Sequence, residues 1–206
     1  MKREKGGMKT KIWILPIGFS LVLIGFLGLA AVSDSRPPTI SEVAGQSSEI
    51  EELLKTVRNK TLMQTDPERL VKAIERLGQL RALTAIDDLS QLLTFRRTFK
   101  GEEIAVAPGR TIINASHLYS PDERYPAIGA LHAIGEPALP ALVMVIETNE
   151  TGSRASENAA YTVGSIFRDE PAREVTYLSE AAAKASTPEG RERLLKAAEA
   201  ARKYVR

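Results

Sequence analysis

Histidines and paired acidic residues are the side chains of this sequence that could take part in catalysis or bind a metal ion. The chain has two histidines, His117 and His132, and no cysteine. Neither histidine belongs to an HExxH motif or to a zinc-ligand cluster, so the sequence offers no zinc site. Asp87 and Asp88 follow the apolar Ile86 and are expected to face solvent on a helix rather than to act as an acid–base pair. We therefore predict no catalytic residue, no cofactor and no metal.

The elements that position these side chains are repeated helix pairs. The tripeptide Glu136-Pro137-Ala138 returns 34 positions later as Glu170-Pro171-Ala172. The preceding apolar stripe, Ala127, Ile128, Leu131 and Ile134, returns 32 positions later as Ala159, Ala160, Val163 and Ile166. A fainter copy lies 54 positions earlier, at Leu70, Ala73, Ile74, Leu77 and Leu80. A fixed period of this size predicts a stack of helix pairs that share a continuous core, with Leu131 and Ile134 buried between repeats.

One repeat is interrupted by an insertion at about residues 95–119, which accounts for the longer offset of 54 positions. Two β-prone runs, 104–106 and 111–113, lie on either side of Pro108-Gly109 and indicate a small hairpin or an ordered loop. After the insertion, the spacing of Ser120 and Glu123 predicts a capping box that restarts the helix.

The remaining helix boundaries follow from caps, prolines and apolar spacing. Thr65 is expected to cap a helix that ends near Leu80, and Ser186 with Glu189 is expected to form a second capping box. The other expected helices cover residues 49–61, a segment around 86–93, and residues 122–134, 137–147, 154–167 and 171–185.

The N-terminal region has the composition of a leader. Residues 12–32 carry no charge and are almost wholly apolar, and five basic residues precede them. About 21 residues are enough to span a bilayer, so residues 1–33 are either a cleaved signal peptide or a transmembrane anchor. Both alternatives place the rest of the chain outside the cytoplasm, either anchored to the membrane or secreted. Residues 34–48, with Pro37-Pro38 and several serines, are expected to form a flexible linker before a repeat domain at 49–206.

The charge distribution excludes one class of partner. The chain has a net charge of +2, of which residues 1–33 contribute +4, so the remainder carries −2. A body that is close to neutral argues against binding to the phosphate backbone of nucleic acid. The absence of cysteine also means that stability must come from burial of a core rather than from disulfides.

Superposing the repeated helices gives a candidate protein-binding face. In the middle repeat the residues expected to point outward are small, and they leave a shallow trough at Gly129, Ala130 and Ala133. Arg76 is expected on one side of the trough and Tyr161 on the other, and both types are common interface anchors. The insertion is expected to fold over the trough; the alternative is that the small residues only ease helix packing. The full outward sets are Lys72, Glu75, Arg76 and Gln79, then Pro126, Gly129, Ala130 and Ala133, then Asn158, Tyr161, Thr162 and Ser165.

These helix pairs resemble HEAT repeats, in which an inner helix rich in Ala and Leu is followed by a short turn and a proline early in the outer helix. Residues 120–185 carry the resemblance most fully, and residues 66–94 carry it in part. The resemblance implies an all-α fold, a short superhelix of about four helix pairs, and a scaffold or adaptor role without catalytic residues.

Three hypotheses on function remain open at this point. The first is a non-catalytic scaffold that binds a protein partner outside the cytoplasm. The second is an enzyme or chaperone of the kind found among HEAT-like lyases, which the lack of cysteine and of a polar pocket disfavours. The third is a structural subunit of an envelope complex.

Overall fold

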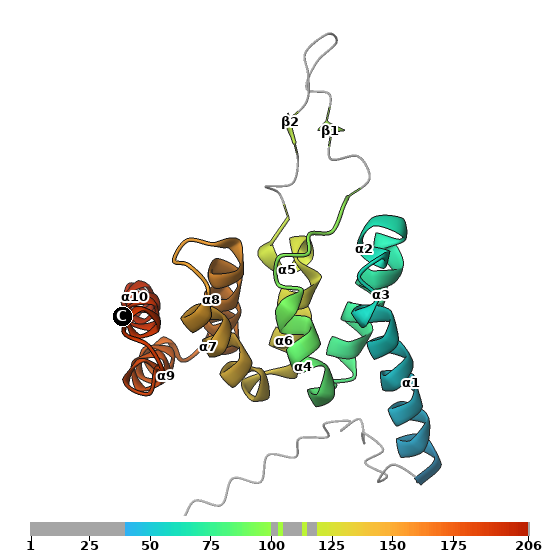
Figure 1. Cartoon of the computed structure of the whole chain (residues 1–206), viewed down its shortest axis with the longest axis horizontal. Helices are drawn as coiled ribbons and strands as arrows, with labels where there is room; N and C mark the ends of the chain where they lie inside the picture. Colours follow the sequence, from blue (N-terminus) through green and yellow to red (C-terminus); the bar gives the residue numbers. More distant parts are fainter. Residues whose placement is uncertain (1–39, 100–102, 105–112, 115–118, 206) are drawn as a thin grey trace, which may run out of the picture. The chain divides into compact units, whose positions relative to one another are not determined.

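The computed structural model describes residues 40–99, 103–104, 113–114 and 119–205. Within these residues the chain is helical apart from one short β-ladder, so the prediction of an all-α fold is confirmed (Figure 1). The predicted leader, 1–33, and the first part of the predicted linker, 34–39, lie outside the described residues. The helices are α1 (Ile40–Arg58), α2 (Leu62–Thr65), α3 (Pro67–Gln79), α4 (Ile86–Gln91), α5 (Pro121–Arg124), α6 (Pro126–Ile134), α7 (Leu139–Thr148), α8 (Arg154–Ile166), α9 (Pro171–Ala183) and α10 (Pro188–Arg202), with 3₁₀ turns η1 (Leu83–Ala85) and η3 (Glu136–Ala138).

The first helix is longer than expected. We predicted a flexible linker over residues 34–48, yet α1 begins at Ile40, so most of that linker is helical. The serines and Gly45 in this stretch have low helix propensity, but propensity is a weak prior. Once the apolar turns from Ile50 to Val57 have formed a helix, adding residues to its end is much easier than starting a new one.

Three helix starts show how the caps select the first residue. Ser120 and Glu123 form the predicted capping box: the Ser120 N–H donates to Glu123 Oε2 (2.7 Å) and the Glu123 N–H donates to Ser120 Oγ (3.3 Å). At the other two starts the capping residue is displaced by one position. Asp66, not Thr65, accepts from the Arg69 N–H, and Thr187, not Ser186, accepts from the Gly190 N–H. In both cases the cap directly precedes a proline, which fits the first helical position.

The helix expected over 122–134 is broken into α5 and α6. Tyr125 adopts non-helical backbone angles, φ −123° and ψ 89°, and Pro126 begins α6. Proline has no N–H for the helical ladder, and it disfavours helical angles in the residue before it. Gly135 then ends α6 with a φ of 83°, a conformation that glycine adopts without strain.

The helices pack as neighbouring pairs. Helix α6 lies between α3 and α8, α4 packs against α6 and α7, and α10 packs against α7 and α9. The predicted stripes form the core: Leu131 is fully buried and Ile134 is 6% exposed, as expected. The largest fully buried side chains lie on α3, α4, α6, α7, α9 and α10, with one more, Leu93, just after α4: Leu70, Val71, Ile74, Leu77, Leu89, Leu93, Ile128, Leu131, Leu142, Ile146, Leu178 and Leu194.

Polar contacts fix the last helix on its neighbours. Glu147, in the last turn of α7, accepts hydrogen bonds from the N–H and from the hydroxyl of Ser186. These two hydrogen bonds lower the pKa of Glu147. Arg193 of α10 donates to the Glu147 carbonyl at 2.6 Å. The displaced cap thus leaves Ser186 free to join α7 to the start of α10.

The insertion begins and ends in a defined neck. Residues Glu103–Ile104 (β1) pair antiparallel with Ile113–Asn114 (β2), and Ile104 lies opposite Ile113. Closer to the repeats, the rings of Phe99 and Tyr119 stack with centroids 3.8 Å apart. The Arg97 N–H donates to the Arg124 carbonyl at 2.8 Å. The two chain segments are therefore held together where they leave the helices.

Among the described residues, no single helix is long and apolar enough to cross a membrane. The segments Pro126–Ile134 and Glu136–Thr148 are long and apolar enough when they are taken together, but the chain bends by 115° between them. Their apolar residues, such as Leu131 and Leu142, are buried in the core.

Candidate binding surface

The predicted trough exists as a shallow hollow. Gly129, Ala130 and Ala133 of α6 line a space of about 330 Å³ between α3, α5 and α6, which we name the α3–α6 hollow. Its other lining residues are Glu75, Gly78, Gln79, Arg97, Asp122, Glu123 and Pro126. The three small residues of the prediction thus share one surface, with Ala133 exposed at its edge.

Part of that small-residue stripe serves helix packing. Ala130 is only 4% exposed, and a Cβ placed on Gly78 of α3 would lie 2.6 Å from the Ala130 Cα. The backbones of α3 and α6 are therefore in contact here, and a side chain at position 78 would force the two helices apart. Ala130 is therefore not an outward residue, and the packing alternative holds for it. Pro126, which was also expected to point outward, is buried.

The positive group at this hollow is not the one expected. Arg76 does not line the hollow; its Nε and Nη2 donate to Glu49 of α1 at 2.6 and 3.1 Å. The hydrogen bond from Arg76 is the main reason that the pKa of Glu49 is lowered. Arg97, in the neck of the insertion, lines the hollow instead and pairs with Glu75 at 3.0 Å.

The outward set expected on α8 is largely buried. Asn158, Thr162 and Ser165 are 5%, 0% and 7% exposed, which contradicts the helix phase that we assigned. Asn158 Nδ2 donates to the Leu93 carbonyl at 2.6 Å, and the Thr162 hydroxyl donates to the Asn158 carbonyl at 2.7 Å. Because these polar groups are small and hydrogen-bonded, they can be buried at little cost.

Tyr161 is the one member of that set that stays exposed, at 38%. It lines a second and larger space of about 450 Å³ between α8, α9 and α10, which we name the α8–α10 hollow. Five of the twelve lining residues are alanine or glycine, and the others include two tyrosines, an arginine and a glutamate. The full lining is Ala160, Tyr161, Gly164, Ser165, Phe167, Arg168, Pro171, Glu174, Ala197, Ala200, Ala201 and Tyr204.

Glu174 is the unusual group of the α8–α10 hollow. Its half-buried carboxylate forms no hydrogen bond or ion pair with any other described residue, and burial raises its pKa. A Cβ on Gly164 would lie 3.3 Å from Glu174 Oε1. The missing side chain at Gly164 therefore makes room for this carboxylate against α8.

Tyr161 of the α8–α10 hollow lies close to an acidic residue of the α3–α6 hollow. Burial raises the pKa of the Tyr161 hydroxyl, and the negative charge of Asp122 raises it further. Asp122 lines the α3–α6 hollow, and its Oδ1 is buried without a hydrogen-bond partner among the described residues. Tyr161 therefore lines the α8–α10 hollow, and its hydroxyl is affected by the charge of an acid that lines the α3–α6 hollow.

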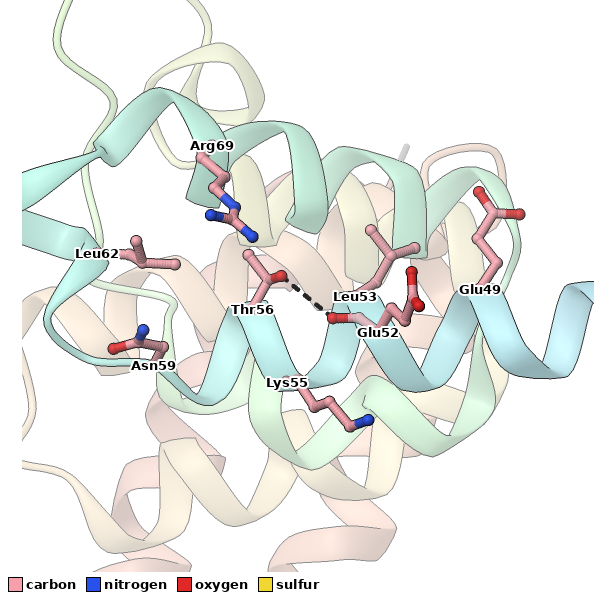
Figure 2. Close-up of a pocket in the computed structure, with 8 residues that line it drawn as sticks. All are labelled: Glu49, Glu52, Leu53, Lys55, Thr56, Asn59, Leu62 and Arg69. Atoms are coloured by element: carbon pink, nitrogen blue, oxygen red, sulfur yellow. Dashed lines mark hydrogen bonds between the residues drawn. The ribbon is translucent and has the colours of Figure 1, made fainter.

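A third space, of about 530 Å³, lies along α1 and the beginning of α3. Figure 2 shows Arg69 of α3 extending toward Thr56 of α1, whereas Lys55 points away on the other side of α1. The Thr56 hydroxyl donates to the carbonyl of Glu52 at 3.1 Å, within its own helix. The lining is mostly polar or charged, and Glu49 is already paired with Arg76, so this groove offers little apolar surface to a partner.

The acidic residues and histidines first considered for catalysis or metal binding do not form a site in the described part of the chain. Asp88 pairs with Arg58 at 2.9 Å and joins α4 to α1, while Asp87 is exposed. His132 is half-buried in the last turn of α6, and His117 lies outside the described residues. The part of the chain that the structure describes contains no group of acidic residues and histidines placed to hold a metal ion.

The sequence pattern missed Arg97, Asp122 and Glu174. Arg97 belongs to the insertion, which has no counterpart in the other repeats, so superposition could not place it. Glu174 lies on an outer helix, and we compared only the inner helices. A signal was nevertheless present, since Gly164 falls at the repeat position of Gly78 and both glycines make room for a neighbouring group.

No protein-family model, no curated protein and no solved structure matches this chain.

Proposed function

We propose that this chain is a non-catalytic protein-binding module, built as a short HEAT-like solenoid, and that its partner binds across the α3–α6 and α8–α10 hollows. The observation that carries the proposal is a pair of hollows, both lined with small residues, in which the exposed Tyr161 of one lies close to Asp122 of the other. Small residues allow close approach of another chain, and tyrosine and arginine are the side chains most often found at the centre of interfaces.

The absence of cysteine makes the proposal testable by site-directed crosslinking. A single cysteine carrying a photo-crosslinker is placed at Ala133 or Ala200, exposed positions in the two hollows, and at Thr84 as an exposed control elsewhere. In cells of the native host, both hollow positions should give an adduct with the same protein, and Thr84 should not. Tyr161→Ala should reduce both adducts. Adducts from Thr84 alone, or equal adducts from all three positions, would refute the assignment of this surface.

We also propose that the module acts outside the cytoplasm, exported or anchored by residues 1–33. The uncharged run 12–32 behind a basic segment supports this location. A reporter that is active only in the cytoplasm, fused after Arg206, should be silent, and strong activity would end this hypothesis.

A further inference from the structure

We propose that the α8–α10 hollow binds a lysine or arginine side chain of a partner polypeptide, whose charged group pairs with Glu174. The proposal rests on the proposed function and adds the chemistry of the partner. It is carried by a carboxylate that has no ion-pair partner among the described residues and by a cavity large enough to admit a side chain.

The first step is the missing counter-charge. The Glu174 carboxylate has no hydrogen-bond or ion-pair partner among the described residues, although it is half-buried between α8 and α9. A desolvated carboxylate is costly unless it is paired. By contrast, Glu136 and Glu170, near the same helix, both pair with Arg173. Glu174 is therefore the acidic residue of the α8–α10 hollow that is available to pair with a cation of a partner.

The second step is the shape of the hollow. Its volume of about 450 Å³ is bounded by the Cβ atoms and backbone of Ala160, Gly164, Ala197 and Ala200. Lysine and arginine bury their methylene stems on apolar surface while their charged ends seek a polar partner. The apolar walls suit such a stem, and Glu174 suits the charge at its end.

The third step is the rim. Tyr161 and Tyr204 are 38% and 75% exposed, and both line the hollow. A cation that passes a tyrosine ring is attracted by its π-face. Arg168 also lines the hollow and has no ion pair within the described residues. A segment with an acidic residue beside its basic one would therefore satisfy both charges.

The test uses the full chain, kept in solution with a mild detergent and immobilised. Its probes are three mixtures of short synthetic peptides with random flanks and one fixed central residue: lysine, norleucine or glutamate. Norleucine reproduces much of the apolar lysine stem without the charge. Retained peptide is quantified by mass spectrometry for the wild type, for Glu174→Gln, and for Glu180→Gln as a matched control on the same helix but outside this hollow.

The wild type should retain lysine peptides about tenfold over norleucine peptides, the discrimination typical of a charge-assisted hydrogen bond. Glu174→Gln should lower that ratio to about one, and Glu180→Gln should leave it unchanged. Equal retention of the lysine and norleucine mixtures, an unchanged ratio in Glu174→Gln, or the highest retention of glutamate peptides would overturn the proposal.

Two further outcomes separate this inference from the proposed function. If no peptide mixture is retained but the crosslinks at Ala133 and Ala200 form, the basic-residue assignment fails and the binding surface stands. If sedimentation shows a dimer of the chain that Glu174→Gln dissociates, the occupant is a second copy and the partner assignment is wrong.

Discussion

Small residues have opposite effects in the two hollows. At the α3–α6 hollow, Gly78 and Ala130 bring two helix backbones into contact, so the small residues remove space. At the α8–α10 hollow, Gly164 faces a carboxylate, and several of the alanines leave a cavity that nothing among the described residues fills. A stripe of small residues therefore indicates a surface that another group can approach closely. Only the three-dimensional structure shows whether that group belongs to the same chain.

The largest effect should come from the core beneath the α3–α6 hollow. Leu131→Ala removes a fully buried side chain between repeats and should lower the free energy of unfolding by about 2–5 kcal/mol. Gln79→Ala, on the exposed rim of the same hollow, should change it by no more than roughly 0.5 kcal/mol. Urea denaturation followed by far-UV circular dichroism measures both. Equal effects would mean that the helix phase of the middle repeat is wrong.

The next largest effect is expected at the contact between Gly78 of α3 and Ala130 of α6. Gly78→Ala places a Cβ 2.6 Å from the Ala130 Cα and 2.9 Å from its Cβ, so α3 and α6 must move apart. Overpacking of this kind costs about 1–3 kcal/mol, which outweighs the gain in helix propensity of about 1 kcal/mol. The same denaturation experiment should show lower stability. A variant as stable as the wild type would show that the two helices are not held at this distance.

The matching substitution in the open hollow should have the opposite sign. In Gly164→Ala the new Cβ meets only the end of the Glu174 side chain, at 3.3 Å, and that end can rotate away. The gain in helix propensity, up to about 1 kcal/mol, should then make the variant as stable as the wild type or more stable. Its retention of lysine peptides should fall, because Glu174 is displaced. A clear loss of stability would show that the Glu174 position is part of the packing.

The smallest effect is the pH dependence of Glu174. Burial raises its pKa above the ordinary 4.5, so between that value and the folded pKa the folded chain binds more protons than the unfolded chain. The contribution of Glu174 to stability therefore falls as pH rises through this window. Glu174→Gln removes that loss, so the variant should gain over the wild type with rising pH, and the two should converge below the ordinary value. Melting temperatures across this range measure the difference, and a constant difference would contradict the burial of the charge.

The sequence predicted the helix pairs well because their signals are local. Apolar spacing located Leu131 and Ile134 in the core, and the capping box at Ser120 set the restart after the insertion. Two predicted helix boundaries were wrong. Pro126 divides the helix expected over 122–134, and α1 begins before Glu49.

The candidate site was predicted only in part, since burial on α8 depends on tertiary contacts. Asn158 is polar and looks solvated in a helical projection, yet the carbonyl of Leu93, 65 residues earlier in the chain, accepts its hydrogen bond. A pattern within one helix contains no information on such a partner. For the same reason Arg76 was expected at the hollow, whereas Glu49 of α1 pairs with it.

The stacked rings of Phe99 and Tyr119, with the Arg97–Arg124 backbone hydrogen bond beside them, close the base of the insertion. Once a base is closed, the entropic cost of the loop beyond it grows only with the logarithm of its length, by roughly 0.6 kcal/mol for each doubling. The length and sequence between these two rings can therefore change with little effect on the helices. The chain offers a natural grafting position, where a recognition loop from another protein could be displayed without redesign of the repeats.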